Sequence, residues 1–181
     1  NVNRANSAFL AAIGHQGADM NTFYDILIVG AGHAGAQAAI ALRQKKFVGS
    51  IGLLGNEKYP PYERPPLSKE YLAGEKPFER ILLRPESFWT EREIDLLTGC
   101  RVSKLDPLDK NVTLTSDEEI GYGKLIWATG GSPRLLDCPG SQARNIHAVR
   151  SRADVDKIIA DLPSVKKVVV IGGGYIGLEA A

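Results

Sequence analysis

Two short stretches of the sequence carry three glycines each in the spacing G-x-G-x-x-G. The first is "GAGHAG", residues 30–35, and the second is "GGGYIG", residues 172–177. In such a loop the first glycine makes a tight turn, the second lets the backbone approach a pyrophosphate, and the third lets a helix pack against a strand. The helix that follows presents free N–H groups and a partial positive charge to the phosphates. The spacing therefore predicts two nucleotide-binding turns, made by Gly30, Gly32, His33, Ala34 and Gly35 and by Gly172, Gly174, Tyr175, Ile176 and Gly177.

The residues around both loops predict the strand and helix that such a turn requires. "YDILIV", residues 24–29, is a nearly continuous apolar run that is typical of a buried parallel strand. Residues 33–46 read as a helix rich in small side chains, and residues 50–54 as a second short strand. Together they predict a right-handed βαβ unit. "KKVVVIGGGYIGLEAA", residues 166–181, begins the same strand–turn–helix pattern a second time.

An acidic residue about 20 positions beyond a nucleotide-binding loop commonly binds a ribose hydroxyl. Glu57 stands at about this distance after the first loop, and its simpler interpretation is a solvated loop carboxylate. The corresponding position after the second loop lies beyond Ala181, so the sequence does not distinguish NAD from NADP.

The stretch "YPPYERPPLSKE", residues 59–70, holds four prolines, and Ser68 and Lys69 follow shortly after the last of them. Proline fixes φ and removes a backbone N–H, so we expect a stiff loop that delivers Ser68 and Lys69 at a defined place. Two interpretations of Lys69 stay open: a cation held beside a cofactor, or the start of a short helix over residues 68–72 with Ser68 as its cap. Arg64 is either a second cofactor residue or a plain loop cation.

The middle of the chain predicts short elements separated by turn residues. We expect a short helix within residues 85–93, strands in residues 94–99, 101–106 and 111–116, and an amphipathic helix over residues 151–162. Within residues 124–131 we expect a further strand that ends in a Gly-Gly turn. The resulting fold class is α/β: a Rossmann-like domain with a small antiparallel β insertion, followed by the start of a second Rossmann-like domain.

Composition and cysteine content exclude several other classes of protein. With 181 residues, 44% hydrophobic, 24% charged and a net charge of +1, nothing predicts a nucleic-acid partner, and no apolar run is long enough for a membrane span. Cys100 and Cys138 are too few for a disulfide framework and predict unreactive thiols in a reducing, cytoplasmic compartment. The spacing of His33 and the other histidines predicts neither a Ser-His-Asp site nor a metal site, and His33 is expected to lie exposed at a helix start.

The motifs "RPPLSK", "ATGGSPR" and "GGGYIGLE" taken together resemble those of the FAD-dependent ferredoxin, rubredoxin and putidaredoxin reductases. These belong to the glutathione-reductase-like flavoproteins with two dinucleotide-binding domains. The resemblance covers the chain from about Met20 to Ala181. It implies electron transfer from NADH or NADPH, through FAD, to a ferredoxin- or rubredoxin-type carrier.

The resemblance also implies roles for individual residues. It assigns the first glycine loop to the FAD pyrophosphate and the second to NAD(P)H. Lys69 is implied to stabilise negative charge on the flavin, and Glu179 to lie near the nicotinamide, where it can pair with Lys69. The remaining residues implied to contact FAD are Arg64, Ala128, Thr129, Gly130 and Arg134.

The same reading predicts three segments: an upstream extension over residues 1–19, an FAD-binding domain over residues 20–140, and the start of an NAD(P)H-binding domain over residues 141–181. A signal peptide is the rival interpretation of the first segment. We expect this chain to be an N-terminal fragment that does not turn over by itself.

Two alternative functions remain open on the sequence: a reductase of a small organic acceptor such as monodehydroascorbate, and a redox-sensing flavoprotein similar to apoptosis-inducing factor. A dithiol reductase is disfavoured because residues 56–83, where a redox-active cysteine pair would stand, contain no cysteine.

Overall fold

The structure is a computed structural model that describes residues 22–181. The predicted extension over residues 1–19 lies outside the described residues. The described chain divides into two compact units, each of which is described by itself. The first unit comprises residues 22–60 and 86–129, and the second comprises residues 61–85 and 130–181. The predicted domain boundary at residue 140 stays a prediction.

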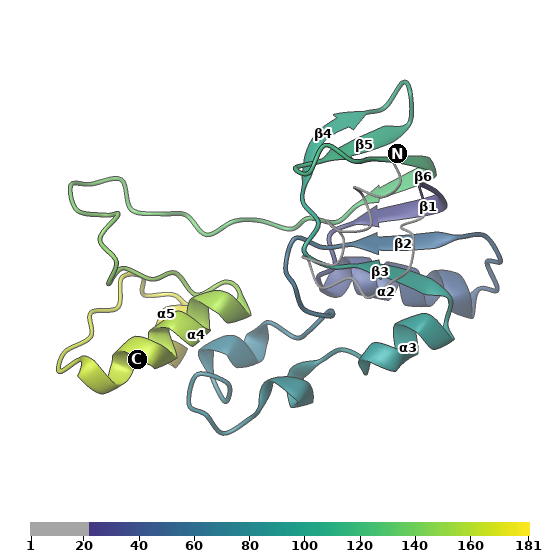
Figure 1. Cartoon of the computed structure of the whole chain (residues 1–181). Coiled ribbons are helices and arrows are strands. Elements are labelled where there is room, and N and C mark those ends of the chain that lie inside the picture. Colours follow the sequence, from purple (N-terminus) through teal and green to yellow (C-terminus); the bar gives the residue numbers. More distant parts are fainter. Residues whose placement is uncertain (1–21) are drawn as a thin grey trace, which may run out of the picture. The chain divides into compact units, whose positions relative to one another are not determined.

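The first unit is built on a six-stranded mixed sheet in the order β3-β2-β1-β6-β5-β4 (Figure 1). The three strands β1, β2 and β3 and the long strand β6 run parallel, whereas β5 pairs with β6, and β4 with β5, in antiparallel fashion. The α/β class and the antiparallel insertion are therefore confirmed. The strands span Phe23–Val29 (β1), Ile51–Leu54 (β2), Ile94–Leu97 (β3), Val102–Asp106 (β4), Asn111–Leu114 (β5) and Glu119–Trp127 (β6).

Strand β1 lies in the middle of the sheet because its sequence is apolar almost throughout. Leu27 and Ile28 are fully buried, as expected for a strand covered on both faces. Helix α2 (His33–Gln44) packs on the sheet beside β1 and β2 through Ala36, Ala39 and Ile40. The small alanine side chains let the helix backbone approach the strands closely.

One arginine ties the end of α2 to two neighbouring segments of the first unit. The Arg43 guanidinium donates to the carbonyl oxygens of Phe47 and Gly49 at 2.7 and 2.8 Å, and to those of Arg92 and Glu93 at 2.8 and 2.6 Å. The last two carbonyls follow helix α3 (Glu86–Glu91) and precede β3. A planar five-donor group suits this task, since it can bond several carbonyls at once.

The second unit consists of short helical elements: η1 (Pro65–Ser68), η2 (Phe78–Ile81), α4 (Arg152–Asp161), η3 (Leu162–Ser164) and α5 (Tyr175–Ala180). The prediction of a short helix starting at Ser68 is wrong, because the helical turn ends there. It starts at Pro65 and Pro66, whose fixed φ and missing N–H suit the first positions of a helical turn.

The proline-rich segment packs on α4 through an aromatic and polar cluster. Arg152 lies 3.9 Å from the ring centroid of Phe78 and donates to the Tyr71 hydroxyl at 3.2 Å. That hydroxyl donates to Asp156 at 2.5 Å, and the Arg152 backbone N–H donates to the Tyr62 hydroxyl at 2.9 Å. The two segments that make up the second unit are therefore joined by specific contacts.

The expected strand before the second glycine loop does not form. Residues 165–173 are assigned to no strand, and Val168, Val169 and Ile171 are exposed. A strand is stabilised by hydrogen bonds to a neighbouring strand, and none of the described residues pairs with this segment. Helix α5 nevertheless starts at Tyr175, directly after the glycines.

No helix among the described residues is long and apolar enough to cross a membrane.

Candidate functional site: two glycine turns and a lysine–glutamate pair

The first glycine turn links the end of β1 to the start of α2. Gly30 has a φ of +115°, a conformation that side chains other than glycine rarely adopt. A Cβ atom on Gly35 would lie 1.9 Å from the Gly30 carbonyl oxygen, so this position also tolerates only glycine without rearrangement. Gly32, between them, has open space where its Cβ would stand. The turn is thus tight at its two ends and open in the middle.

The neighbouring strands hold this turn on both sides. The Gly30 N–H donates to the Leu54 carbonyl of β2 at 2.7 Å, and the Ala128 N–H, after β6, donates to the Val29 carbonyl at 2.7 Å. A Cβ on Gly30 would lie 2.2 Å from the Ala128 carbonyl oxygen. The predicted residues Ala128 and Thr129 therefore follow a strand end that lies directly against the first glycine turn.

At the N-terminus of α2, no side chain of the cap or of the first turn accepts a hydrogen bond from the first backbone N–H groups. Its N-cap is Gly32, with no side-chain hydrogen bond, and its first turn holds no acidic residue. Helix α4 differs, because Ser151 and Asp154 form a capping box that satisfies its first N–H groups. The free N–H groups of the 12-residue helix α2, the open space at Gly32 and the tight ends of the turn together fit a phosphate group.

Glu57 lies in the bend that follows β2, in the same unit as the first glycine turn, and is half-buried. Its backbone carbonyl accepts a hydrogen bond from the Gly99 N–H at 2.9 Å, so the end of β3 holds the bend in place. A Cβ on Gly55 would lie 2.6 Å from the Cβ of Ala31, which shows how closely this bend approaches the glycine turn. His33 and Ala34 lie exposed at the start of α2.

The second glycine turn repeats the local geometry of the first. Gly172 has a φ of +123°, and a Cβ on Gly177 would lie 2.0 Å from the Gly172 carbonyl oxygen. Gly174 is the N-cap of α5 and has open space at its Cβ position. Tyr175 and Ile176, which follow it, are exposed.

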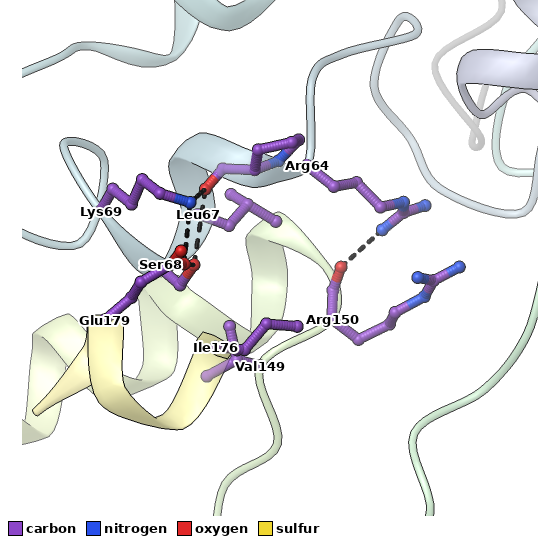
Figure 2. Close-up of a pocket in the computed structure, with 9 residues that line it drawn as sticks. Arg64, Leu67, Ser68, Lys69, Val149, Arg150, Ile176 and Glu179 are labelled. Carbon is purple, nitrogen blue, oxygen red and sulfur yellow. Dashed lines mark hydrogen bonds and ion pairs between the residues drawn. The ribbon is translucent and has the colours of Figure 1, made fainter. Parts of the chain in front are cut away.

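Lys69 and Glu179, which are far apart in sequence, form an ion pair within the second unit. The Lys69 Nζ lies 2.8 Å from Glu179 Oε2, and the buried Ser68 hydroxyl donates to the same oxygen at 2.8 Å (Figure 2). The hydrogen bonds from Lys69 and Ser68 hold the pKa of Glu179 below its ordinary value, because both stabilise the ionised carboxylate. The pairing that the resemblance implied is thus present between these two side chains.

The pair lies at one side of a pocket with a volume of about 260 Å³. Ligand pockets are commonly about 300–1,000 Å³, so this one would hold only part of a dinucleotide. Arg64 and Arg150 line its other side, and their guanidinium groups lie away from Glu179 (Figure 2). The Arg64 guanidinium donates to the Arg150 carbonyl at 2.6 Å. Three cations and one carboxylate therefore line the pocket, together with Pro65, Leu67, Ser68, Val149 and Ile176.

Sequence reasoning missed five of the residues that line this pocket, and two of these five are polar: Ser68 and Arg150. Ser68 was considered only as a helix cap, although it stands next to the predicted lysine. Arg150 gave no signal, because it lies outside all the motifs. A Cβ atom on Gly130 would lie 3.0 Å from a guanidinium nitrogen of Arg150. The absence of a side chain at Gly130 therefore leaves room for the arginine.

The predicted residues fall into both units, and the structure describes each group by itself. The first unit holds the first glycine turn, Glu57, Ala128 and Thr129. The second unit holds Arg64, Lys69, Gly130, Arg134, the second glycine turn and Glu179. Arg134 is exposed and does not line the pocket of Lys69.

Both cysteines are free thiols. Cys100 is buried in the first unit, and this burial, with the nearby Glu118 carboxylate, raises the pKa of its thiol. Cys138 is exposed in the second unit. A raised pKa lowers the thiolate fraction, so Cys100 is a poor nucleophile.

Residues 24–181 match the family model of the pyridine nucleotide-disulphide oxidoreductases. The chain is 59% identical over 161 residues to a ferredoxin–NAD(P)+ reductase of Sphingomonas sp., covering 89% of this chain and 39% of that protein. It is 44% identical to a rubredoxin–NAD+ reductase of Pseudomonas putida, covering 86% of this chain and 40% of that protein. A crystal structure of a ferredoxin reductase from Rhodopseudomonas palustris matches with a TM-score of 0.82 and 40% identity, over 88% of this chain and 39% of that one.

These matches show the family to which the chain belongs. It is a member of the pyridine nucleotide-disulphide oxidoreductase family, and its similarity to ferredoxin and rubredoxin reductases confirms the predicted resemblance. The chain spans about two fifths of the length of these relatives.

Proposed function

We propose that the protein is a flavoprotein oxidoreductase that takes electrons from NADH or NADPH and passes them, through FAD, to a ferredoxin- or rubredoxin-type carrier. The observation that carries the proposal is the Lys69–Glu179 ion pair at 2.8 Å. It joins the proline-stiffened loop that the family resemblance assigns to the flavin with the helix that it assigns to the nicotinamide nucleotide. The match to named ferredoxin and rubredoxin reductases supports the choice of carrier.

In this proposal the first glycine turn, with the free N–H groups at the start of α2, binds the FAD pyrophosphate. Glu57 bonds the ribose, and Ala128 and Thr129 line the same strand end. Lys69 and Arg64 approach the flavin ring, together with Gly130, Arg134 and Arg150. When bound, the flavin accepts a hydride and releases single electrons, which the nicotinamide does not readily do.

The second glycine turn is proposed to bind NAD(P)H, through Gly172, Gly174, Tyr175, Ile176 and Gly177. Glu179 then lies close to the nicotinamide and holds the Lys69 ammonium in place. A positioned cation beside a centre that gains negative charge is preorganised electrostatic stabilisation. A cytoplasmic location, consistent with two free cysteines, completes the proposal.

Two matched alanine variants of the complete gene product test the proposal. Gly32 and Gly174 have open space at their Cβ positions and ordinary φ values of −82° and −81°, so alanine costs the fold little at either site. Gly32→Ala puts a methyl group where the first phosphate would approach, and we expect loss of visible flavin absorbance with unchanged thermal stability of the apoprotein. Gly174→Ala should retain flavin and raise the KM for NAD(P)H.

The decisive measurement is anaerobic reduction of the flavin by NAD(P)H, with and without a ferredoxin. Fast bleaching in the wild type and slower bleaching in a Lys69→Ala variant are the expected results. A purified protein that binds no FAD would overturn the proposal. A long-lived reduced flavin with little turnover on added ferredoxin would favour a redox sensor, and fast turnover only with a small organic acceptor would favour that class of reductase.

A further inference from the structure

Glu179 accepts two hydrogen bonds on one oxygen from two consecutive residues. The Ser68 hydroxyl and the Lys69 ammonium each lie 2.8 Å from Oε2. Both donors also lie 3.4 Å from the Pro65 carbonyl oxygen, which is a much weaker contact. Because a serine hydroxyl has a single hydrogen, the shorter distance favours Glu179 as its acceptor.

The two donors differ in how firmly they are held. Ser68 is buried, with 4% of its surface exposed, at the end of the η1 turn. The Lys69 side chain is 42% exposed. It has about four rotatable bonds, whereas the Ser68 side chain has about one. A long exposed side chain loses more rotamer freedom when it is fixed in one geometry than a short buried one does. Ser68 is therefore the fixed donor and Lys69 the movable one.

We propose that Ser68 is a positioning residue that keeps Glu179 ionised and in place independently of Lys69. The Lys69 ammonium can then leave Glu179 for an anionic group in the pocket without releasing the carboxylate. The identity of that group, a flavin gaining negative charge, rests on the proposed function. The assignment of Ser68 as the fixed donor and Lys69 as the movable donor rests on the described geometry alone.

Among the described residues, the charged side chains that line the pocket besides Lys69 and Glu179 are two cations. They are Arg64 and Arg150, and their guanidinium groups lie away from Glu179 (Figure 2). Helix α5 itself carries no charged residue other than Glu179. Both arginines are kept in every variant described below, so comparisons among the variants isolate the effects of Ser68 and Lys69.

The test is an NMR titration of the complete gene product, without bound ligand, that follows the Glu179 side-chain carboxyl carbon after ¹³C labelling of glutamate. The signal is assigned by its absence in Glu179→Gln. Four forms are compared: wild type, Lys69→Met, Ser68→Ala and the double variant. We expect the Glu179 pKa to rise in each single variant and to rise further in the double variant, because each donor stabilises the ionised form.

The decisive comparison is between Lys69→Met and the double variant. If Ser68 holds the carboxylate independently, Glu179 titrates at a higher pH in the double variant than in Lys69→Met. Equal titration in these two forms would overturn the proposal. Should the serine variants fail to fold, Lys69→Met alone decides: a Glu179 pKa still below that of the solvent-exposed glutamates supports the proposal, and one equal to theirs overturns it.

Ser164→Ala is the matched control. It removes an exposed hydroxyl of the second unit that bonds only to the Asp161 carbonyl among the described residues, and it should leave the Glu179 titration unchanged. Since the titration needs no cofactor, a protein that binds no flavin would refute the proposed function and leave this result standing.

Discussion

The two glycine turns share nearly the same local geometry and differ in what surrounds them. Gly30 and Gly172 have φ values of +115° and +123°, and the helix that follows begins three residues after each. Around Gly30, however, strand β2 and the end of β6 contribute hydrogen bonds and close backbone contacts. Around Gly172, apart from the glycine itself and its two chain neighbours, none of the described atoms lies within 4 Å of the Cβ position. The conformation of such a turn is therefore local, whereas its anchoring depends on neighbouring strands.

The helices after the two turns are also held differently. Helix α2 packs through buried alanines on the sheet, and Arg43 ties its end to four carbonyls. Helix α5 has no buried residue and is tied to η1 by the bonds that Glu179 accepts from Ser68 and Lys69. Apolar packing fixes the first helix, and a charged contact fixes the second.

The largest expected effect separates Gly30 from Gly172. Gly30→Ala imposes a strained φ and places a methyl group 2.2 Å from the Ala128 oxygen, so we expect a loss of about 3 kcal/mol or more of unfolding free energy. Gly172→Ala imposes only the strained φ, about 1–3 kcal/mol at most. Tryptophan fluorescence during urea unfolding reports on the first unit, since Trp89 and Trp127 both lie there.

We therefore expect the fluorescence midpoint to fall sharply in Gly30→Ala and to stay unchanged in Gly172→Ala. Equal midpoints in the two variants would show that the strands do not anchor the first turn.

Arg43→Lys tests the hydrogen bonds from the Arg43 guanidinium that anchor the end of α2. Among the described residues, no arginine of α5 plays a comparable part. A lysine ammonium cannot reach four carbonyls at once, so we expect a loss of about 1–2 kcal/mol, measured by the same fluorescence transition. Arg101→Lys is the control, since Arg101 is an exposed cation of the same unit. A stability of Arg43→Lys equal to that of the control would contradict a structural role for this guanidinium.

The contact that holds α5 should depend on pH. The hydrogen bond from Lys69 lowers the Glu179 pKa most, and the one from Ser68 lowers it next. The ionised carboxylate therefore stabilises the folded state fully when the pH is above the ordinary glutamate pKa of about 4.3. This stabilisation is lost as the pH falls through the lowered pKa. Amide chemical shifts of α5 should change in that acidic range, while those of residues 36–40 in α2 stay constant. Constant shifts in α5 would contradict the inferred tie.

The smallest effect concerns the two cysteines. Exposed Cys138 should react with a thiol reagent within minutes at neutral pH, whereas buried Cys100, with its raised thiol pKa, should react only after unfolding. Counting the thiols modified before and after adding urea measures this difference. Fast modification of both in the native protein would mean that the core near Cys100 opens readily.

Much of the first unit was predictable because its signals are local. The apolar run of β1, the alanine-rich helix and the glycines between them specify strand, turn and helix within about 20 residues of one another. The end of the helix was predicted less accurately. It was expected at residue 46, but the helix ends at Gln44, and Lys46 has a φ of +61°, which is not a helical conformation.

The candidate site was less predictable. Lys69 and Glu179 were proposed as a pair from family resemblance, and their spacing alone would not have suggested it. Ser68 and Arg150 went unassigned because their contacts join segments separated by more than 80 residues, and no local pattern records such a contact.

The sequence by itself determined the two glycine turns, the α/β order of elements and the stiffness of the proline-rich loop. Each depends on backbone torsions and side-chain periodicity that neighbouring residues specify. Only the tertiary structure decided that β2 and β6 anchor one turn and that Ser68 and Lys69 share one carboxylate oxygen. Such contacts depend on the packing of distant segments, which forms when the chain buries its apolar side chains and pairs its polar groups.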